Sequence, residues 1–254
     1  MIVRILTYNI ENGGEGREDL IREVLRSSRA DVCLLQEIID PEFIHRLAAA
    51  LNQNYFVTRS RGRLQAALLS RFPIASQNTY HPGRLTHPLL EATVEYRPGS
   101  TLALFGVHLV APAFDLRIEL QRVKQLGEIL RRIGELRPGP YVMAGDFNAV
   151  APGDSINLKH LPASLRLSIQ LHGGTVARQA IARVRKAGLI DSYRKVHSGA
   201  LGYTLPAAGP NVRLDYIFAD PALDVIGSEV VTEPPAVHSA SDHLPLWAEF
   251  RLTD

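Results

Sequence analysis

Apolar and polar residues alternate in short segments along this chain of 254 residues, and a period of two is typical of β-strands. The run at 32–36 is almost wholly apolar, so this strand is predicted to be buried. The pattern predicts strands at 2–10, 32–36, 55–58, 65–70, 91–96, 101–109, 203–205, 214–219, 225–231 and 245–251. A further strand begins at Tyr141 and runs into a loop that contains Asp146 and Asn148.

Apolar residues at helical spacing predict four helices between these strands. Their ranges are 18–28, 41–51, 116–133 and 176–187. Pro41 stands in the first turn of the second helix, where its missing N–H costs no hydrogen bond. The segment 152–174 holds glycines, prolines and few apolar residues, and we expect a long surface excursion there.

The arrangement of these elements favours one fold class. The sequence contains no internal repeat and no linker rich in proline, glycine or serine, so we expect one domain over 1–254. Many strands with few helices between them predict an α+β fold, in which two packed sheets are flanked by helices. Hydrophobic residues make up 46% of the chain, which is enough for a substantial core and excludes a disordered protein.

Charge and cysteine content narrow the function only slightly. The net charge of +2 is compatible with an anionic substrate, but it is far from the charge of a dedicated nucleic-acid-binding arm. Cys33 is the single cysteine, so it is predicted to be a buried structural thiol rather than half of a disulfide. No signal-peptide pattern and no apolar stretch of about 20 residues occurs. We therefore expect a soluble cytoplasmic protein without membrane insertion, and the oligomeric state is left open.

Polar residues of a particular kind recur at the ends of the apolar strands. These are acids, amides and histidines, whereas an ordinary solvated strand face carries Thr, Lys and Arg. If the strands share a sheet, the side chains converge. They are Asn9, Glu11, Glu37, His108, Asp146, Asn148, Asp215, Asp242 and His243.

This set of residue types suits the hydrolysis of a phosphate ester. Such a reaction needs a hard cation to neutralise the phosphate, and the carboxylates of Glu37 and Asp242 suit Mg²⁺, with Mn²⁺ as the second candidate. Asn9 and Asp146 are then placed to orient the metal ligands or the attacking water.

The same reaction needs a base and donors for the phosphate oxygens. His243 can activate water if a carboxylate such as Asp215 holds its other ring nitrogen. Asn148 and His108 can supply neutral or cationic donors to the non-bridging oxygens.

Each residue taken alone also has an ordinary structural explanation. The sequence around His108 is also that of a buried core histidine, and Glu37 is also suited to the first turn of a helix. Asp215 fits a surface ion pair with Arg213, and the segment 146–148 fits a turn. The chemical hypothesis depends on the whole set, because all of these explanations must hold at once to replace it.

Seven short motifs in a fixed order make the chain resemble the endonuclease/exonuclease/phosphatase superfamily. This group includes deoxyribonucleases, apurinic endonucleases, sphingomyelinases and inositol-phosphate phosphatases. The resemblance covers nearly the whole chain. The motifs are Thr7-Tyr-Asn9, Leu35-Gln-Glu37, Leu69-Ser-Arg-Phe-Pro-Ile74, Gly106-Val-His108, Gly145-Asp-Phe-Asn148, Arg213-Leu-Asp-Tyr216 and Ser241-Asp-His243.

The resemblance implies a four-layer α/β/β/α sandwich of two mixed sheets with the site at one end. By motif match, Glu37 resembles the main metal carboxylate of the family, and Asn9 and Asp242 resemble its neighbours at the metal. His243 resembles the catalytic histidine, and Asp215 resembles the carboxylate that orients it.

The remaining matches include two departures from the family pattern. Asp146 and Asn148 resemble the pair that positions the nucleophile and the scissile phosphate, and His108 resembles a second histidine found in some branches. Those branches pair this histidine with a glutamate, where this chain has Gln65, so a phosphate contact is favoured over an acid role for His108. Glu11 replaces an aspartate, and a metal contact through water is predicted for it.

The motifs define the reaction more closely than they define the substrate. A phosphodiester is favoured, with nucleic acid as one candidate substrate. A phosphomonoesterase acting on a small metabolite or a phosphoinositide is the alternative, and a catalytically inactive binding protein is the weaker one. Three rim segments, 81–88 with Arg84, 111–117 with Arg117, and 153–174, are predicted to select the leaving group.

Two arginine-rich clusters bear on a nucleic-acid substrate, since a nuclease needs a basic surface. We expect both clusters to be solvated faces rather than a binding surface. The first contains Arg59, Arg61 and Arg63, and the second contains Arg178, Arg183, Arg185, Lys186, Arg194 and Lys195.

Overall fold

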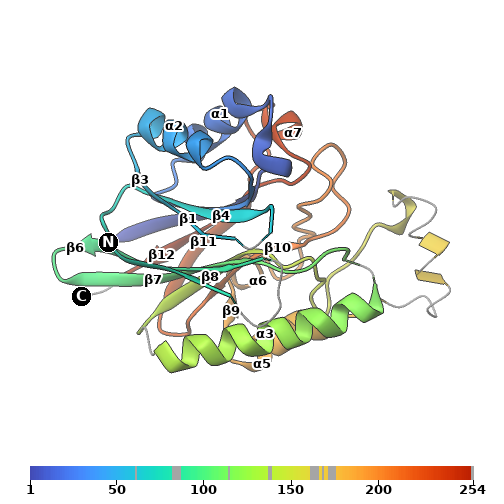
Figure 1. Ribbon diagram of the computed structural model, residues 1–254. Coiled ribbons are helices and arrows are strands. Elements are labelled where there is room, and N and C mark those ends of the chain that lie inside the picture. Colours follow the sequence, from blue (N-terminus) through green and yellow to red (C-terminus); the bar gives the residue numbers. More distant parts are fainter. Residues whose placement is uncertain are drawn as a thin grey trace.

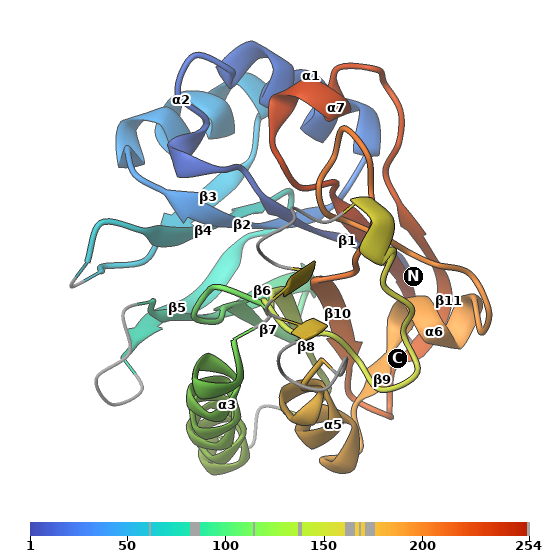
Figure 2. The same ribbon diagram turned by 90° about the vertical axis from the view of Figure 1, so that its right-hand side faces the viewer.

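The layered architecture predicted from the sequence is confirmed. The computed structural model describes residues 1–60, 62–81, 87–113, 115–136, 139–160, 166–167, 169–170 and 176–252. Within these residues the strands form two six-stranded sheets that pack face to face (Figure 1). Helices cover the outer face of each sheet, so the layers follow the order helix, sheet, sheet, helix (Figure 2).

The first sheet, sheet A, joins the N-terminal strands to the last two strands of the chain. Its strands in spatial order are β11 (Asp224–Val230), β12 (Leu246–Arg251), β1 (Ile2–Asn9), β2 (Val32–Ile38), β4 (Gln65–Ser70) and β3 (Asn54–Val57). β1 and β2 are parallel, and the other pairs are antiparallel. The sheet is therefore mixed, as predicted.

The second sheet, sheet B, is built from the middle of the chain. Its strands in spatial order are β5 (Ile74–Tyr80), β6 (Leu89–Arg97), β7 (Ser100–His108), β8 (Tyr141–Asp146), β10 (Asp215–Ala219) and β9 (Ile190–Asp191). β7 and β8 are parallel, and the other pairs are antiparallel.

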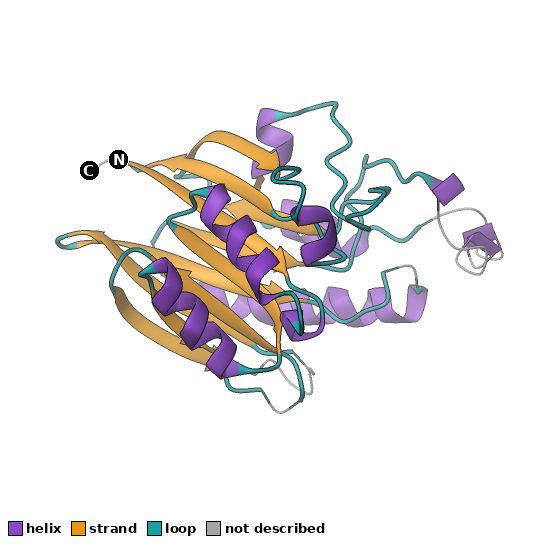
Figure 3. Cartoon of the chain, turned by 90° about the horizontal axis from the view of Figure 1, so that it is seen from above, coloured by secondary structure: helices purple, strands orange, loops and turns teal. Residues whose placement is uncertain are grey.

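The helices form the two outer layers, which Figure 3 shows from above. On sheet A lie α1 (Glu18–Ser28), α2 (Pro41–Leu51) and the short α7 (Val237–Ala240). On sheet B lie α3 (Leu116–Leu136) and α5 (Gln179–Lys186). Short α6 (Ser192–Val196) packs near β10 and β11. Two 3₁₀ turns, η1 (Asn12–Gly14) and η2 (Leu158–His160), lie in loops.

The strands are apolar on both faces because both faces of each sheet are covered. In β7, Leu104 points into the core between the sheets, and Phe105 packs under α3. In β1, Ile5 points between the sheets and Leu6 points toward α1 and α2. Cys33 is buried in the core between sheet A and helices α1 and α2, as predicted. Burial raises the pKa of its thiol to about 12.

The sequence-based element assignments need three corrections. The predicted strand 203–205 is only an isolated bridge between Leu205 and Val212, because Pro206 has no N–H to continue a ladder. The helix predicted from 176 begins at Gln179, since Arg178 has non-helical backbone angles. The sequence pattern did not predict strands β5 and β9 or helices α6 and α7.

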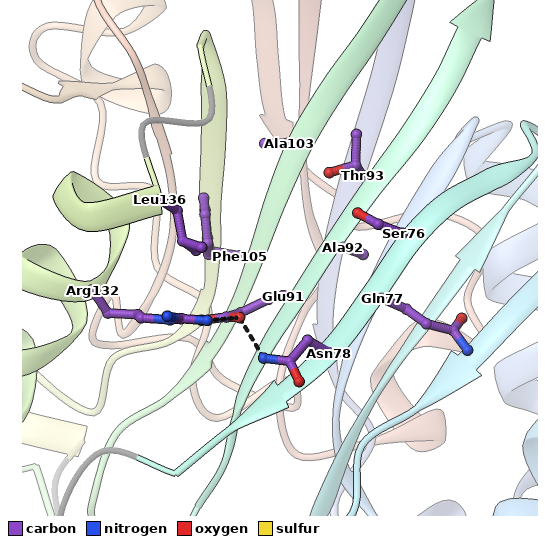
Figure 4. A pocket seen from close by; sticks show the side chains of 10 residues that line it. All are labelled: Ser76, Gln77, Asn78, Glu91, Ala92, Thr93, Ala103, Phe105, Arg132 and Leu136. Atoms are coloured by element: carbon purple, nitrogen blue, oxygen red, sulfur yellow. Dashed lines mark hydrogen bonds and ion pairs between the residues drawn. The ribbon is translucent and has the colours of Figure 1, made fainter.

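Sheet B and α3 are also joined by a polar contact on the outer face of the sheet. There the Glu91 carboxylate accepts hydrogen bonds from Arg132 at 2.8 and 3.0 Å and from Asn78 at 2.6 Å (Figure 4). The Arg132 guanidinium also lies 4.9 Å from the centre of the Tyr80 ring. Asn78, Glu91 and Arg132 line a hollow of about 300 Å³. Because the charges in this hollow pair with one another, we treat it as a structural contact.

Candidate active site

The predicted site residues converge at one end of the sandwich. The chain termini lie at the other end, where Ile2 pairs with Arg251 (Figure 1). Asn9 ends β1 and His108 ends β7. Asp146 ends β8, which runs parallel to β7, and the register places His108 beside Asp146. Antiparallel β10 begins at this same end, so Asp215 lies opposite Asp146. The topology thus gathers residues that are far apart in the sequence.

The backbone is unusual at the points where it presents these side chains. Glu37 sits at a β-bulge in β2 and has a φ of 64°, and Asn148 has a φ of 46°. At Gly145, an added Cβ would lie 1.7 Å from the carbonyl oxygen of Val107. Only glycine therefore allows β8 to approach β7 this closely, which brings Asp146 beside His108.

An amide links the two carboxylates of the first half of the site. Asn9 Nδ2 donates to Glu37 Oε1 and to Asp146 Oδ2, each at 3.1 Å. Its Oδ1 accepts from the Glu11 N–H at 3.0 Å, and this bond assigns the oxygen and nitrogen of the amide. Asn9 therefore donates to both carboxylates, and its predicted place close to a metal stays a prediction.

Asp146 is almost completely buried and is bonded on both oxygens. Its Oδ1 accepts from the backbone N–H of Asn148 at 2.8 Å, and its Oδ2 accepts from Asn148 Nδ2 at 3.1 Å. Asn148 Nδ2 also donates to the Leu109 carbonyl at 3.1 Å. Burial raises the pKa of Asp146 above its usual range, because a charged carboxylate loses hydration there.

His243 and Asp215 form a buried hydrogen-bonded pair. His243 Nδ1 lies 2.8 Å from Asp215 Oδ2, and its Nε2 lies 3.8 Å from Asp146 Oδ2. Burial lowers the pKa of His243, but the charges of Asp215 and Asp146 outweigh this effect and raise it to about 10. Thr204 Oγ1 accepts from the backbone N–H of Asp215 at 3.3 Å and so holds the start of β10. No local sequence pattern predicted this role for Thr204.

His108 occupies the other side of Asp146. Its Nε2 lies 3.7 Å from Asp146 Oδ2 and 3.9 Å from Glu37 Oε1. Burial lowers the pKa of His108 to about 3, so the ring is neutral at physiological pH. The alternative of an ordinary core histidine does not fit, because the ring faces two carboxylates.

A second histidine, His87, stacks on this ring. The ring centres of His87 and His108 are 4.1 Å apart and the planes differ by 12°. His87 Nδ1 lies 3.3 Å from the His108 carbonyl oxygen. Burial lowers the pKa of His87 as well. His87 was predicted only as part of a rim segment, because no local pattern in the sequence indicates that it stacks on His108.

The remaining acids lie toward the solvent. Glu37 Oε2 accepts from the Asn12 N–H at 2.7 Å, and 20% of the Glu37 side chain stays exposed. Asp242 lies at the surface, but neighbouring atoms remove part of its hydration. This loss of hydration, together with the negative charges of Glu11 and Glu37, raises the pKa of Asp242. Glu11 Oε2 pairs with Arg17 at 2.8 Å, so its predicted water-mediated metal contact stays a prediction.

The donor set suits a hard divalent cation. Glu37 and Asp242 offer carboxylate oxygens that are open to solvent, and hard cations prefer such oxygens. A second group, Asp146, Asp215 and His243, has ligand atoms within 4.8 Å of one another. Asp215 Oδ1 is buried and has no hydrogen-bond partner among the described residues. The first group was predicted to bind metal, and the second was predicted for catalysis.

Directly beside the site lies a buried ion cluster that the sequence did not predict. Arg213 is fully buried and donates to Asp154 at 2.7 Å and to Asp191 at 2.9 and 2.7 Å. Arg194 also pairs with Asp154, at 2.9 Å. The proposed surface pair between Arg213 and Asp215 is therefore wrong. We call Asp154, Asp191, Arg194 and Arg213 the arginine clamp.

Asp154 belongs to the segment 152–174, which is therefore not a simple surface excursion at its start. Arg178 donates to the Ala151 carbonyl, and Arg185 donates to the Pro152 carbonyl at 3.1 Å. Together with Arg194, these arginines hold the chain that follows Asn148. Three members of the second basic cluster thus bind this protein's own backbone and acids, whereas a solvated face was expected.

Several sequence predictions fall outside the described residues. These are Arg61, the part of the first rim segment that contains Arg84, residue 114 of the second rim segment, and residues 161–165, 168 and 171–174 of the third.

Comparison with known proteins assigns the family. The model of the Endonuclease/Exonuclease/phosphatase family matches residues 6–243. The chain therefore belongs to this family of metal-dependent phosphoesterases. No curated protein matches the sequence. None of the described helices is both long enough and apolar enough to cross a membrane.

Solved structures of other proteins have a similar fold. An AP endonuclease from Archaeoglobus fulgidus has a TM-score of 0.76 at 19% identity, over 98% of this chain and 100% of that chain. The 3'-5' exonuclease NExo from Neisseria meningitidis gives 0.75 at 22% identity, over 98% and 100%. TDP2 from D. rerio, complexed with single strand DNA product, gives 0.70 at 20% identity, over 99% of each chain.

Proposed function

We propose that this protein hydrolyses a phosphodiester with the help of a divalent cation, and that His243 and Asp215 activate the attacking water. One observation carries the proposal: Asp215 holds Nδ1 of His243 at 2.8 Å, while Nε2 faces the interior of the site beside Asp146. An imidazole oriented in this way can accept a proton at Nε2.

Each member of the pair has a defined task in this proposal. His243 takes the proton of water at Nε2, and Asp215 stabilises the imidazolium that forms. The same carboxylates that raise the pKa of His243 stabilise this charged form. A cation held nearby by Glu37 and Asp242 would favour the neutral ring that a base requires, because like charges repel.

The other side chains position the reacting groups. Asp146 accepts hydrogen bonds from both Asn9 and Asn148, so its carboxylate is fixed between the two histidines and can orient the water. Asn148 and His108 are placed to contact the non-bridging oxygens of the phosphate. With its pKa lowered to about 3, His108 acts as a neutral hydrogen-bonding group rather than as an acid.

Glu37 and Asp242 would hold the cation, with Asn9 fixing the Glu37 carboxylate. When bound, a divalent cation neutralises charge on the phosphate and polarises its oxygens. We propose Mg²⁺, because the ligands are carboxylate oxygens, and Mn²⁺ suits the same ligands.

A nucleic acid is the leading candidate for the diester. The proposal is supported by the likeness to TDP2 complexed with single strand DNA product and to NExo bound to a product DNA hairpin. However, Arg178, Arg185 and Arg194 already bind carbonyls and acids of this chain, so they are not a free basic surface.

The test compares hydrolysis of bis-p-nitrophenyl phosphate and p-nitrophenyl phosphate in Mg²⁺, in Mn²⁺ and in EDTA. We expect metal-dependent turnover of the diester that is lost in His243→Ala and kept in His45→Ala, whose ring lies exposed on α2. Turnover of the monoester alone would replace the diesterase proposal with a phosphomonoesterase. Turnover that persists in EDTA would contradict the metal requirement.

A further inference from the structure

The ring of His108 lies at the centre of the site, yet neither nearby carboxylate bonds it closely. Its Nε2 is 3.7 Å from Asp146 and 3.9 Å from Glu37, which is beyond hydrogen-bonding distance. The glutamate expected by family resemblance is Gln65 here, and Gln65 pairs with Ile38 at the start of β4. Another group must therefore define the orientation of the His108 ring.

Strand pairing brings His87 to this ring. β6 and β7 are antiparallel, and Leu90 lies opposite Gly106. Continuing this antiparallel register by two residues places Pro88, just before β6, opposite His108 at the end of β7. Pro88 lies between His87 and β6, and it restricts the backbone conformation of His87, the residue before it. The position of His87 thus follows from the end of a hydrogen-bonded ladder.

The contact between the two rings is close and has two parts. The ring planes are nearly parallel, with centres 4.1 Å apart. His87 Nδ1 also lies 3.3 Å from the His108 carbonyl, so the ring is tied to the backbone of the residue on which it stacks. A flat ring held against another prevents the second ring from rotating about its own Cβ–Cγ bond.

We propose that His87 is a positioning residue, which holds the His108 ring so that Nε2 faces Glu37, Asp146 and the scissile phosphate. This inference rests on the proposed function, and it assigns to a stacked ring the task that a glutamate performs in other branches. His87 acts through the flat face of its ring, and its nitrogen serves only to anchor it to the backbone.

The first experiment compares kcat and KM of His87→Ala and His87→Phe on bis-p-nitrophenyl phosphate. We expect kcat to fall about 10- to 100-fold in His87→Ala with KM within about threefold, because misplacement of a contact group affects the reaction step. His87→Phe keeps a flat ring and should stay within about threefold of wild type. His45→Ala is the matched control, because it removes a histidine that stacks on Tyr55 at an exposed place on α2.

Three outcomes of this comparison would overturn the proposal. Unchanged kcat in His87→Ala would mean that stacking by His87 does not position the His108 ring for the reaction. Equal losses in His87→Ala and His87→Phe would mean that the ring nitrogen itself acts. A rise in KM without a fall in kcat would make His87 a substrate contact rather than a positioning residue.

A double-mutant cycle tests whether His87 acts through His108. In a His108→Ala background, adding His87→Ala should change kcat by less than about twofold, because the ring to be positioned is already missing. A full additional loss in the double variant would contradict the proposal.

A crystal structure of His87→Ala separates this inference from the proposed function, since it needs no turnover. The His108 ring should turn away from Asp146 in His87→Ala and keep its wild-type position in His87→Phe. If wild type hydrolyses neither ester but the ring turns as expected, the function fails and the positioning role stands. A His108 ring that stays in place in His87→Ala overturns the positioning role.

Discussion

Two buried clusters of charge lie side by side in this protein, and their bonding differs. The arginine clamp places two guanidinium groups against the carboxylates of Asp154 and Asp191, with bonds of 2.7 to 3.0 Å. The catalytic cluster places the ring of His243 beside the two buried carboxylates of Asp146 and Asp215. Only one close ion-pair bond, of 2.8 Å, occurs in it among the described residues.

This difference separates a structural cluster from a chemical one. In the clamp, the acids and guanidinium groups balance each other, so the cluster stabilises the loop that follows Asn148. In the catalytic cluster, carboxylates outnumber the cation, and Asp215 Oδ1 finds no partner among the described residues. Such an excess of negative charge is costly for folding and favours binding of a cation.

The largest expected effect comes from removing one carboxylate charge from each cluster. Asp215→Asn keeps the shape of the side chain but cannot stabilise an imidazolium, so kcat should fall about 10³- to 10⁴-fold. Asp191→Asn, the matched variant in the clamp, should leave kcat within about threefold of wild type. Steady-state kinetics on the diester measure both. Equal losses in the two variants would remove the distinction between the clusters.

Arg213→Met should destabilise the fold most. It leaves the buried carboxylates of Asp154 and Asp191 opposite an apolar methionine side chain. Breaking a buried ion pair costs about 3 to 5 kcal/mol. Urea unfolding followed by circular dichroism gives the free energy of unfolding. Arg251→Met, which removes an exposed pair with Asp224, is the control and should cost less than about 1 kcal/mol. A similar small loss for Arg213→Met would show that the clamp is not structural.

The pH dependence of stability should report the catalytic cluster. The pKa of His243 is about 10 in the folded protein, above its ordinary value. Its contribution to stability is therefore complete below about pH 6.5 and is lost as the pH rises toward 10. The stability difference between wild type and His243→Gln in EDTA should shrink as the pH rises over this range. A difference independent of pH would contradict the raised pKa.

The smallest expected effect is stabilisation by the cation itself. At a Mg²⁺ concentration of about 100 times Kd, binding adds about 2.7 kcal/mol to the free energy of unfolding. Thermal unfolding of wild type should shift upward with Mg²⁺, and Glu37→Gln should lose most of this shift. Glu42→Gln, on the exposed start of α2, is the control. Equal shifts in all three proteins would place the cation elsewhere.

The sequence determined those elements whose signals are local. Helix α2 has the predicted bounds because Asp40 caps its first N–H groups at 2.9 and 3.1 Å and Pro41 fits its first turn. Helix α1 and strand β4 also have the predicted bounds. The motifs named the residues of the candidate site, since each lies at or near the end of a strand that its own apolar pattern predicts.

The tertiary structure decided what depends on distant partners. β5 has a mostly polar sequence and forms only because β6 supplies its hydrogen bonds at the edge of sheet B. Arg213 is separated from Asp154 by 59 residues, so no local pattern could pair them. His87 meets His108 through the end of a ladder between β6 and β7. Local hydrophobic period and capping act over a few residues, whereas burial and charge pairing are set only when the sheets close on one another.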